Sequence, residues 1–136
     1  MPEFNLRSSF YNITYSNHFK TTFHSFFKKK EYHLEDIQDT FIRLDEIFKD
    51  CKRWKNPIEN LFVFKKETKR GNLIAKIYLP ITKENISKKK GTRLLIVIKQ
   101  RENEIELCHI SPKNKIASGS KNDFPPEIYS CLEKEF

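Results

Sequence analysis

The sequence predicts an α+β domain in which an N-terminal helical hairpin packs on a curved, mainly antiparallel sheet of four to five strands, followed by a short C-terminal helix. Strand-like and helix-like patterns occur in the order β-α-α-β-β-β-β-α, so most strands are grouped after the helices. The strand-like runs are closely spaced, as in antiparallel hairpins. The length of 136 residues suits a single domain over 1–136, with 1–14 as an N-terminal strand or arm.

The N-terminal part predicts one strand and then two helices. Residues 10–14 are aromatic and β-branched, which favours a strand, and Ser16 or Asn17 can cap the helix that follows. The apolar stripe of this helix has spacings of three and four and consists of Phe19, Phe23, Phe26 and Phe27. The stripe of a second helix consists of Leu34, Ile37, Phe41, Leu44 and Phe48. Pro57 ends the helical pattern.

The second half of the chain predicts the sheet and a last helix. Strands are predicted at 61–64, 73–81, 93–98 and 104–110. Residues 73–81 alternate between an apolar face and a face that carries Lys76 and Tyr78. The run at 93–98 is apolar on both faces, which is typical of a central strand. A basic loop at 82–92 contains Gly91, and a Pro-Pro pair opens the helix predicted at 124–136.

The charge of the chain indicates a polyanionic partner. The formal net charge is +8. Residues 65–101 hold 12 basic and two acidic side chains, whereas 31–60 and 102–136 each have a balance of −3. A basic excess concentrated in this way is typical of a phosphate-binding surface, and a solvated lysine-rich face is the alternative. Nucleic acid or an acidic protein is therefore the expected partner.

Other features exclude several classes of protein. No run of about 18 apolar residues occurs, and the first ten residues lack the apolar segment of a secretory signal. Three scattered cysteines suit a reducing compartment, so we expect a cytoplasmic protein. No P-loop, dinucleotide or zinc-protease motif is present, and no histidine has metal-ligand spacing to a cysteine. By alternation, His109 shares a face with Leu107 and is expected to be a core or edge histidine.

Four segments, in a consistent order, carry a resemblance to one known family. AKIYLPI at 75–81 resembles a K-I-[KR]-L strand, and KKKGTRLLIVI at 88–98 resembles a basic loop, a glycine, an arginine and an apolar strand. IELCHISPKNK at 105–115 is similar to a closing strand with a basic turn, and EIYSCLEKEF at 127–136 is similar to a C-terminal helix. In this order, over roughly residues 15–136, the segments resemble the RelE/ParE superfamily of type II toxin–antitoxin toxins.

The resemblance implies a RelE-like fold and a small basic toxin that a cognate acidic antitoxin neutralises. RelE-like members act at the ribosome and cleave mRNA without a metal or cofactor, by attack of the 2′-hydroxyl on the adjacent phosphate. ParE-like members inhibit DNA gyrase instead. We therefore predict a ribosome-dependent mRNA endoribonuclease that contacts mRNA and ribosomal RNA. The alternatives are a gyrase inhibitor and a non-catalytic basic RNA-binding domain derived from a toxin.

The resemblance also implies which side chains act on RNA. The cleavage needs cations beside the developing charge of the phosphorane, a base for the 2′-hydroxyl and an acid for the leaving oxygen. Arg93, just after the glycine, is expected to bind the scissile phosphate through both arms of its guanidinium. The predicted catalytic set is Lys76, Tyr78, Arg93, Lys113 and Tyr129. The predicted RNA-binding set is Lys88, Lys89, Lys90 and Lys115.

The chain departs from the family pattern at two places. Tyr78 stands where relatives usually have Lys or Arg, which removes one cation and introduces a ring that can stack on a base or take a proton. Ser111-Pro112 stands before the basic turn of Lys113, where relatives usually have an aromatic or small residue. Tyr129 resembles the C-terminal tyrosine that RelE stacks on an mRNA base, and its alternative role is to dock the last helix.

Overall fold

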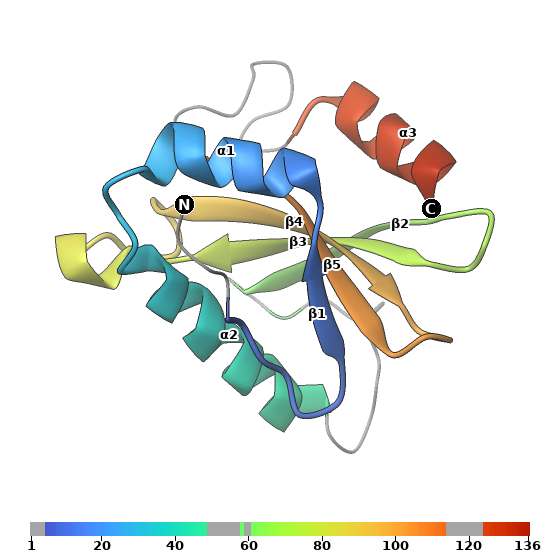
Figure 1. Cartoon of the computed structure of the whole chain (residues 1–136), viewed down its shortest axis with the longest axis horizontal. Coiled ribbons are helices and arrows are strands. Elements are labelled where there is room, and N and C mark those ends of the chain that lie inside the picture. The colour runs from blue at the N-terminus through green and yellow to red at the C-terminus, as the bar shows by residue number, and fades with distance from the viewer. Residues whose placement is uncertain (1–4, 49–57, 59–60, 114–123) are drawn as a thin grey trace.

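A five-stranded sheet forms the middle of the molecule, which we describe from a computed structural model over residues 5–48, 58, 61–113 and 124–136 (Figure 1). The elements are β1 (Asn12–Tyr15), α1 (Asn17–Phe27), α2 (His33–Phe48), β2 (Phe62–Glu67), β3 (Leu73–Leu79), the 3-10 helix η1 (Thr82–Glu84), β4 (Thr92–Lys99), β5 (Glu104–Pro112) and α3 (Pro126–Glu135). The strand order is β1-β5-β4-β3-β2. Strand β1 is parallel to β5, and the other pairs are antiparallel. The predicted α+β class and element order are confirmed.

Helix α1 begins where its sequence satisfies the first turn. The Ser16 hydroxyl accepts a hydrogen bond from the Phe19 amide at 3.0 Å, because this amide has no partner inside the helix. Phe19, Phe23 and Phe27 are buried, whereas Phe26 is 36% exposed. The helix thereby covers the side of the sheet that includes β5 with three of the four phenylalanines of its stripe.

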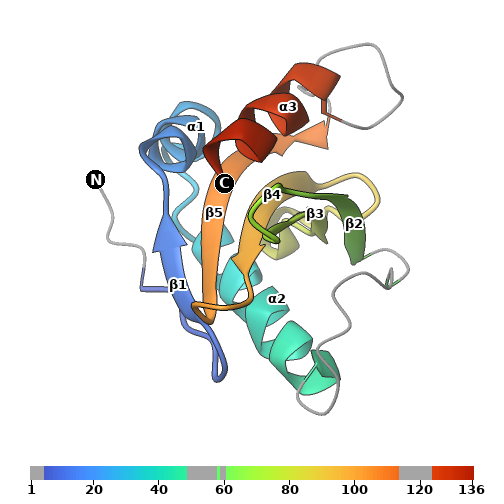
Figure 2. The same ribbon diagram turned by 90° about the vertical axis from the view of Figure 1, so that its right-hand side faces the viewer.

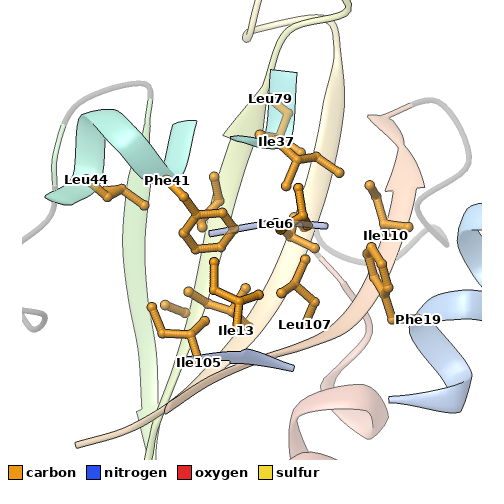
Figure 3. Packing of buried hydrophobic residues seen from close by; sticks show 14 of the residues in the cluster. Leu6, Ile13, Phe19, Ile37, Phe41, Leu44, Leu79, Ile105, Leu107 and Ile110 are labelled. Carbon is orange, nitrogen blue, oxygen red and sulfur yellow. The ribbon is translucent and has the colours of Figure 1, made fainter. Parts of the chain in front are cut away.

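Helix α2 packs on the same face of the sheet as α1. Ile37, Phe41 and Leu44 are at most 1% exposed and meet apolar residues of the strands in one core cluster (Figure 3). The N-terminal arm is tied to this helix through Asp45, whose carboxylate accepts hydrogen bonds from the Ser8 hydroxyl at 2.6 Å and the Ser9 amide at 2.7 Å. The predicted helical hairpin on one sheet face is confirmed.

Helix α3 covers the other face of the sheet. Tyr129 and Leu132 of this helix form a second core cluster with Ile74, Leu95 and other residues of the opposite face. Figure 2 shows α3 and α2 on different sides of the strands. Strand β4 therefore lies between two apolar layers, as its run of apolar residues predicts. No helix in the described ranges has the length and apolarity needed to cross a membrane.

Strand β5 contains a bulge that the sequence pattern does not reveal. The register between β4 and β5 shifts so that Cys108 is an extra residue and His109 lies opposite Leu95. The His109 ring consequently packs edge-on against Phe124 in the second cluster, with 5.0 Å between ring centroids. The expectation that His109 shares a face with Leu107 is therefore wrong, because the bulge interrupts the two-residue alternation.

Neighbouring residues of α2 offer a test of this packing. Phe41 is 1% exposed and Ile42 is 53% exposed. Phe41→Ala leaves a cavity between α2 and the sheet, so we expect the free energy of unfolding to fall by about 3–5 kcal/mol. Ile42→Ala is the matched control and is expected to change it by about 0.5 kcal/mol or less. Urea unfolding measures both, and equal losses would contradict the assigned face of α2.

Candidate functional site

The basic block of the sequence is divided between the two ends of the sheet. Leu73 pairs with Ile98 at one end of β3, and Leu79 pairs with Thr92 at the other. At the usual rise of a strand, the two ends are roughly 20 Å apart. The first end carries the basic residues of the β2–β3 and β4–β5 turns, and the second carries the loop at 80–91.

Ion pairs distinguish these two ends. At the first end, Lys66 pairs with Glu133 at 2.9 Å and Lys99 pairs with Glu104 at 2.8 Å. At the second end, the one acidic residue of the loop, Glu84, pairs with Lys30 at 3.0 Å. The remaining charged residues of the loop are Lys83, Lys88, Lys89 and Lys90. The second end therefore has the stronger positive field and is the candidate site.

Three of the predicted catalytic residues form one cluster at this end. Tyr78 of β3 lies opposite Arg93 of β4, and Lys76 lies on the same face of β3. The Lys76 Nζ atom is 5.0 Å from the Tyr78 ring centroid, and the guanidinium carbon of Arg93 is 4.4 Å from it. Both cations are buried, whereas Tyr78 is half-buried. Two positive charges thus lie close to the ring, whose π face attracts them.

The Arg93 side chain is hydrogen-bonded to the loop that precedes it. Its Nη1 atom donates to the Lys88 carbonyl at 2.7 Å, and its Nη2 atom donates to the Lys89 carbonyl at 2.9 Å. The side chain is only 2% exposed, and burial lowers the pKa of Arg93 from its ordinary value. Two of the three guanidinium nitrogens therefore hold the loop. The expected bidentate contact with a phosphate would use these same two nitrogens, and it stays a prediction.

Two further features fix the shape of the loop. A Cβ atom at Gly91 would overlap the Leu79 carbonyl oxygen, so only glycine allows this close approach of the backbones. The buried carboxylate of Asp36 accepts a hydrogen bond from the Thr82 amide at 3.1 Å and from the Thr82 hydroxyl. Helix α2 thereby anchors the start of the loop. The backbone that carries the three lysines at 88–90 is therefore fixed by hydrogen bonds. Burial together with the charge of Arg43 lowers the pKa of Lys88.

Lys113 lies beside this loop but faces a different part of the surface. Its amide donates to the Gly91 carbonyl at 2.9 Å. Lys113 and Lys90 line a hollow of about 530 Å³, together with Lys30 and Phe26. Neither Lys76 nor Arg93 lines that hollow. The sequence places Phe26 in the apolar stripe of the first helix, so no signal indicated that Phe26 or Lys30 lies near the site.

One predicted site residue, Tyr129, lies apart from the cluster. Tyr129 is 9% exposed and packs in the second core cluster, with its ring 6.4 Å from that of Phe124. Tyr129 therefore docks α3 on the sheet, which is the alternative role given to it above. The Lys65 Nζ atom lies over its ring, 5.8 Å from the centroid. Lys115 lies outside the described residues.

The register also brings a residue of the second family departure into the cluster. Ser111 of β5 lies opposite Arg93 and is 2% exposed. Its hydroxyl and the Arg93 Nε atom are both buried, and neither has a hydrogen-bond partner among the described residues. Buried polar groups are normally paired, so these two unpaired atoms are unusual. They lie on adjacent strands, and Arg93 is the direct neighbour of Tyr78.

A histidine pair lies elsewhere, between α1 and β5. The Nε2 atom of His18 and the Nδ1 atom of His109 are 2.7 Å apart, and the rings are stacked. One nitrogen must donate and the other accept, so this contact is lost when both rings are protonated. Burial, with a smaller contribution from His18, lowers the pKa of His109 to about 4.

The comparisons with known proteins found a likeness among solved structures. No protein-family model and no curated protein matches the chain. Among solved structures, the chain is similar to a crystal structure of the archaeal RelE–RelB complex from Pyrococcus horikoshii, with 10% sequence identity and a TM-score of 0.45. The likeness covers 78% of this chain and 98% of that chain. A likeness of this extent carries no argument about function, which rests on the residues of the chain itself.

Arg93→Gln tests whether this side chain holds the loop. The Lys88 and Lys89 carbonyls lose their charged donor, and such hydrogen bonds stabilise by about 1.5–3 kcal/mol. We expect the free energy of unfolding to fall by about 2 kcal/mol. Relative to the wild type, hydrogen exchange with solvent should accelerate more at the amides of 88–91 than at those of β4. Arg101→Gln, at an exposed turn, is the control and should stay within about 0.5 kcal/mol of the wild type. Unchanged exchange at 88–91 would contradict the assignment.

The histidine pair predicts a pH dependence of stability. His109 has a pKa of about 4 in the folded chain, against an ordinary value of 6.5. Between these values the unfolded chain binds more protons, so the free energy of unfolding is fully retained above pH 6.5 and falls as the pH decreases towards 4. His109→Gln removes this titration. We expect the difference in unfolding free energy between wild type and variant to shrink by about 2 kcal/mol from pH 7 to pH 4.5. If the difference in unfolding free energy stays constant with pH, the assigned titration of His109 is wrong.

Proposed function

We propose that the protein is a toxin directed at RNA, and that it acts as a ribosome-dependent mRNA endoribonuclease. The observation that carries the proposal is the cluster of Lys76, Tyr78 and Arg93, which the strand register places beside the basic loop. The loop supplies phosphate contacts that do not depend on base sequence. The motif resemblance implies the same strands and the same loop.

Within this proposal, Tyr78 is the catalytic residue that touches RNA. It is the most accessible member of the cluster. Its phenolate form can take the proton of the attacking 2′-hydroxyl, and the phenol so formed can donate a proton to the leaving 5′-oxygen. Lys76 and Arg93 both lie close to its ring, so their charges favour the negative charge that develops on the phosphorane. Arg93 is in addition a positioning residue, because it holds the loop carbonyls.

An acidic antitoxin is the partner that fits this protein. The net charge of +8 and the lysines of the loop favour an acidic chain that masks the RNA-binding end. The helical hairpin exposes apolar side chains, with Ile42 at 53% and Ile47 at 41%, to which an amphipathic segment can dock.

Two observations favour a second candidate, a non-catalytic RNA-binding domain. The two Nη atoms of Arg93 are bonded to backbone carbonyls, and Tyr78 replaces a family cation. Both differences weaken phosphate activation while leaving the loop lysines able to bind RNA. Primer extension on mRNA during induction of the protein separates the candidates. New 5′ ends support the endoribonuclease, intact mRNA with a DNA-damage response supports a gyrase inhibitor, and harmless expression supports the binding domain.

Tyr78→Phe tests the chemical role of the hydroxyl. The variant keeps the ring beside Lys76 and Arg93 but removes the group that transfers protons. We expect the rate of mRNA cleavage on purified translating ribosomes to fall about 100-fold or more, with little change in RNA affinity or thermal stability. Tyr32→Phe, which removes a hydroxyl bonded to Glu84, is the control and should cleave as the wild type does. Wild-type cleavage by Tyr78→Phe would sink the assignment.

A further inference from the structure

We propose that the hollow at the C-terminal end of α1 binds one unpaired nucleotide of an RNA strand, with the base on Phe26 and the phosphate between Lys90 and Lys113. The inference rests on the proposed function, because it gives the same RNA a second contact next to the basic loop. It names the substrate at this point as single-stranded, since a base inside a duplex cannot reach a ring in a hollow.

The size and walls of the hollow suit a nucleotide. Its volume of about 530 Å³ lies in the usual range of small-molecule sites, roughly 300–1,000 Å³. Ile81 and Ile86 of the loop form part of the wall, and the last turn of α1 forms another part with Phe26. In Figure 1, this end of α1 lies on the same side of the molecule as η1.

Phe26 is the one phenylalanine of the α1 stripe that the core does not use. It is 36% exposed, whereas Phe19, Phe23 and Phe27 are at most 2% exposed. Its ring packs edge-on against Phe27, with 6.5 Å between centroids, so a buried residue supports it. A supported and accessible ring is a platform for base stacking, which every base allows through its π face.

The charges of the hollow favour an anion. Lys30 is already paired with Glu84, so Lys90 and Lys113 carry its uncompensated charge. Within the described ranges, neither of these two lysines forms an ion pair. The hydrogen bond from the Lys113 amide to Gly91, the neighbour of Lys90, keeps the two residues adjacent. An acidic peptide would satisfy the lysines alone, whereas a nucleotide satisfies the lysines through its phosphate and Phe26 through its base.

Fluorescence of a base analogue tests the inference. The probe is a hexamer of 2′-O-methyl uridines with one internal 2-aminopurine, whose fluorescence falls on stacking and whose backbone cannot be cleaved by 2′-hydroxyl attack. Wild type is expected to bind with quenching at low salt. Phe26→Leu should lose the quenching and bind about 5- to 100-fold more weakly, as for the loss of one stacked base. Phe26→Tyr should retain both properties.

A matched control and a competitor complete the test. Phe10 is 40% exposed and does not line the hollow, so Phe10→Leu should bind and quench as the wild type does. Wild-type quenching and affinity in Phe26→Leu would overturn this inference alone and leave the proposed function standing. Equal competition by oligoglutamate and by unlabelled hexamer would also overturn it, since the hollow would then respond to charge only. Failure of wild type to bind any RNA at low salt would overturn both proposals together.

Discussion

The burial of β4 on both faces is the constraint on which the rest of the structure depends. Its residues from Leu94 to Ile98 are 0% exposed and point alternately into the two core clusters. A strand of this kind needs cover on both sides, so the α1–α2 hairpin and α3 must dock on opposite faces. The same burial extends to Arg93, where a cation has to find partners inside the protein. It finds them in the carbonyls of Lys88 and Lys89, which is why the basic loop has a defined shape.

Much of the fold follows from local pattern. Spacings of three and four placed both helices of the hairpin, and the two-sided apolar run at 93–98 identified the central strand. Other features depend on long-range packing and have no local signal. The parallel pairing of β1 with β5 requires knowledge of both elements, and the short helix η1 forms because Asp36 of α2 caps it at Thr82. The bulge at Cys108 likewise became visible only with the register of β4 known.

The candidate site was predictable to the extent that it lies on strands. Alternation puts Lys76 and Tyr78 on one face, and the hairpin register adds Arg93 to them. The positions of residues on loops and helices were harder to predict, because they depend on backbone paths that local sequence patterns do not define. Lys113 lies at a neighbouring hollow, and Tyr129 belongs to the core beneath α3. The orientation of the Arg93 guanidinium was unpredictable for the same reason, since it follows from the turn at 88–91.

The pairing of β1 with β5 has a consequence for how the chain is made. Asn12 is synthesised well before its partner Glu104, because most of the described chain lies between them. Strand β5 is therefore synthesised long after β1, and β1 has no strand to pair with until β5 has formed. Sequence-distant contacts of this kind slow folding, because a long loop must close before they form. Nascent chains that stop before β5 cannot complete the sheet, so the charged loop and the cluster beside it rest on a complete sheet only after β5 has been made.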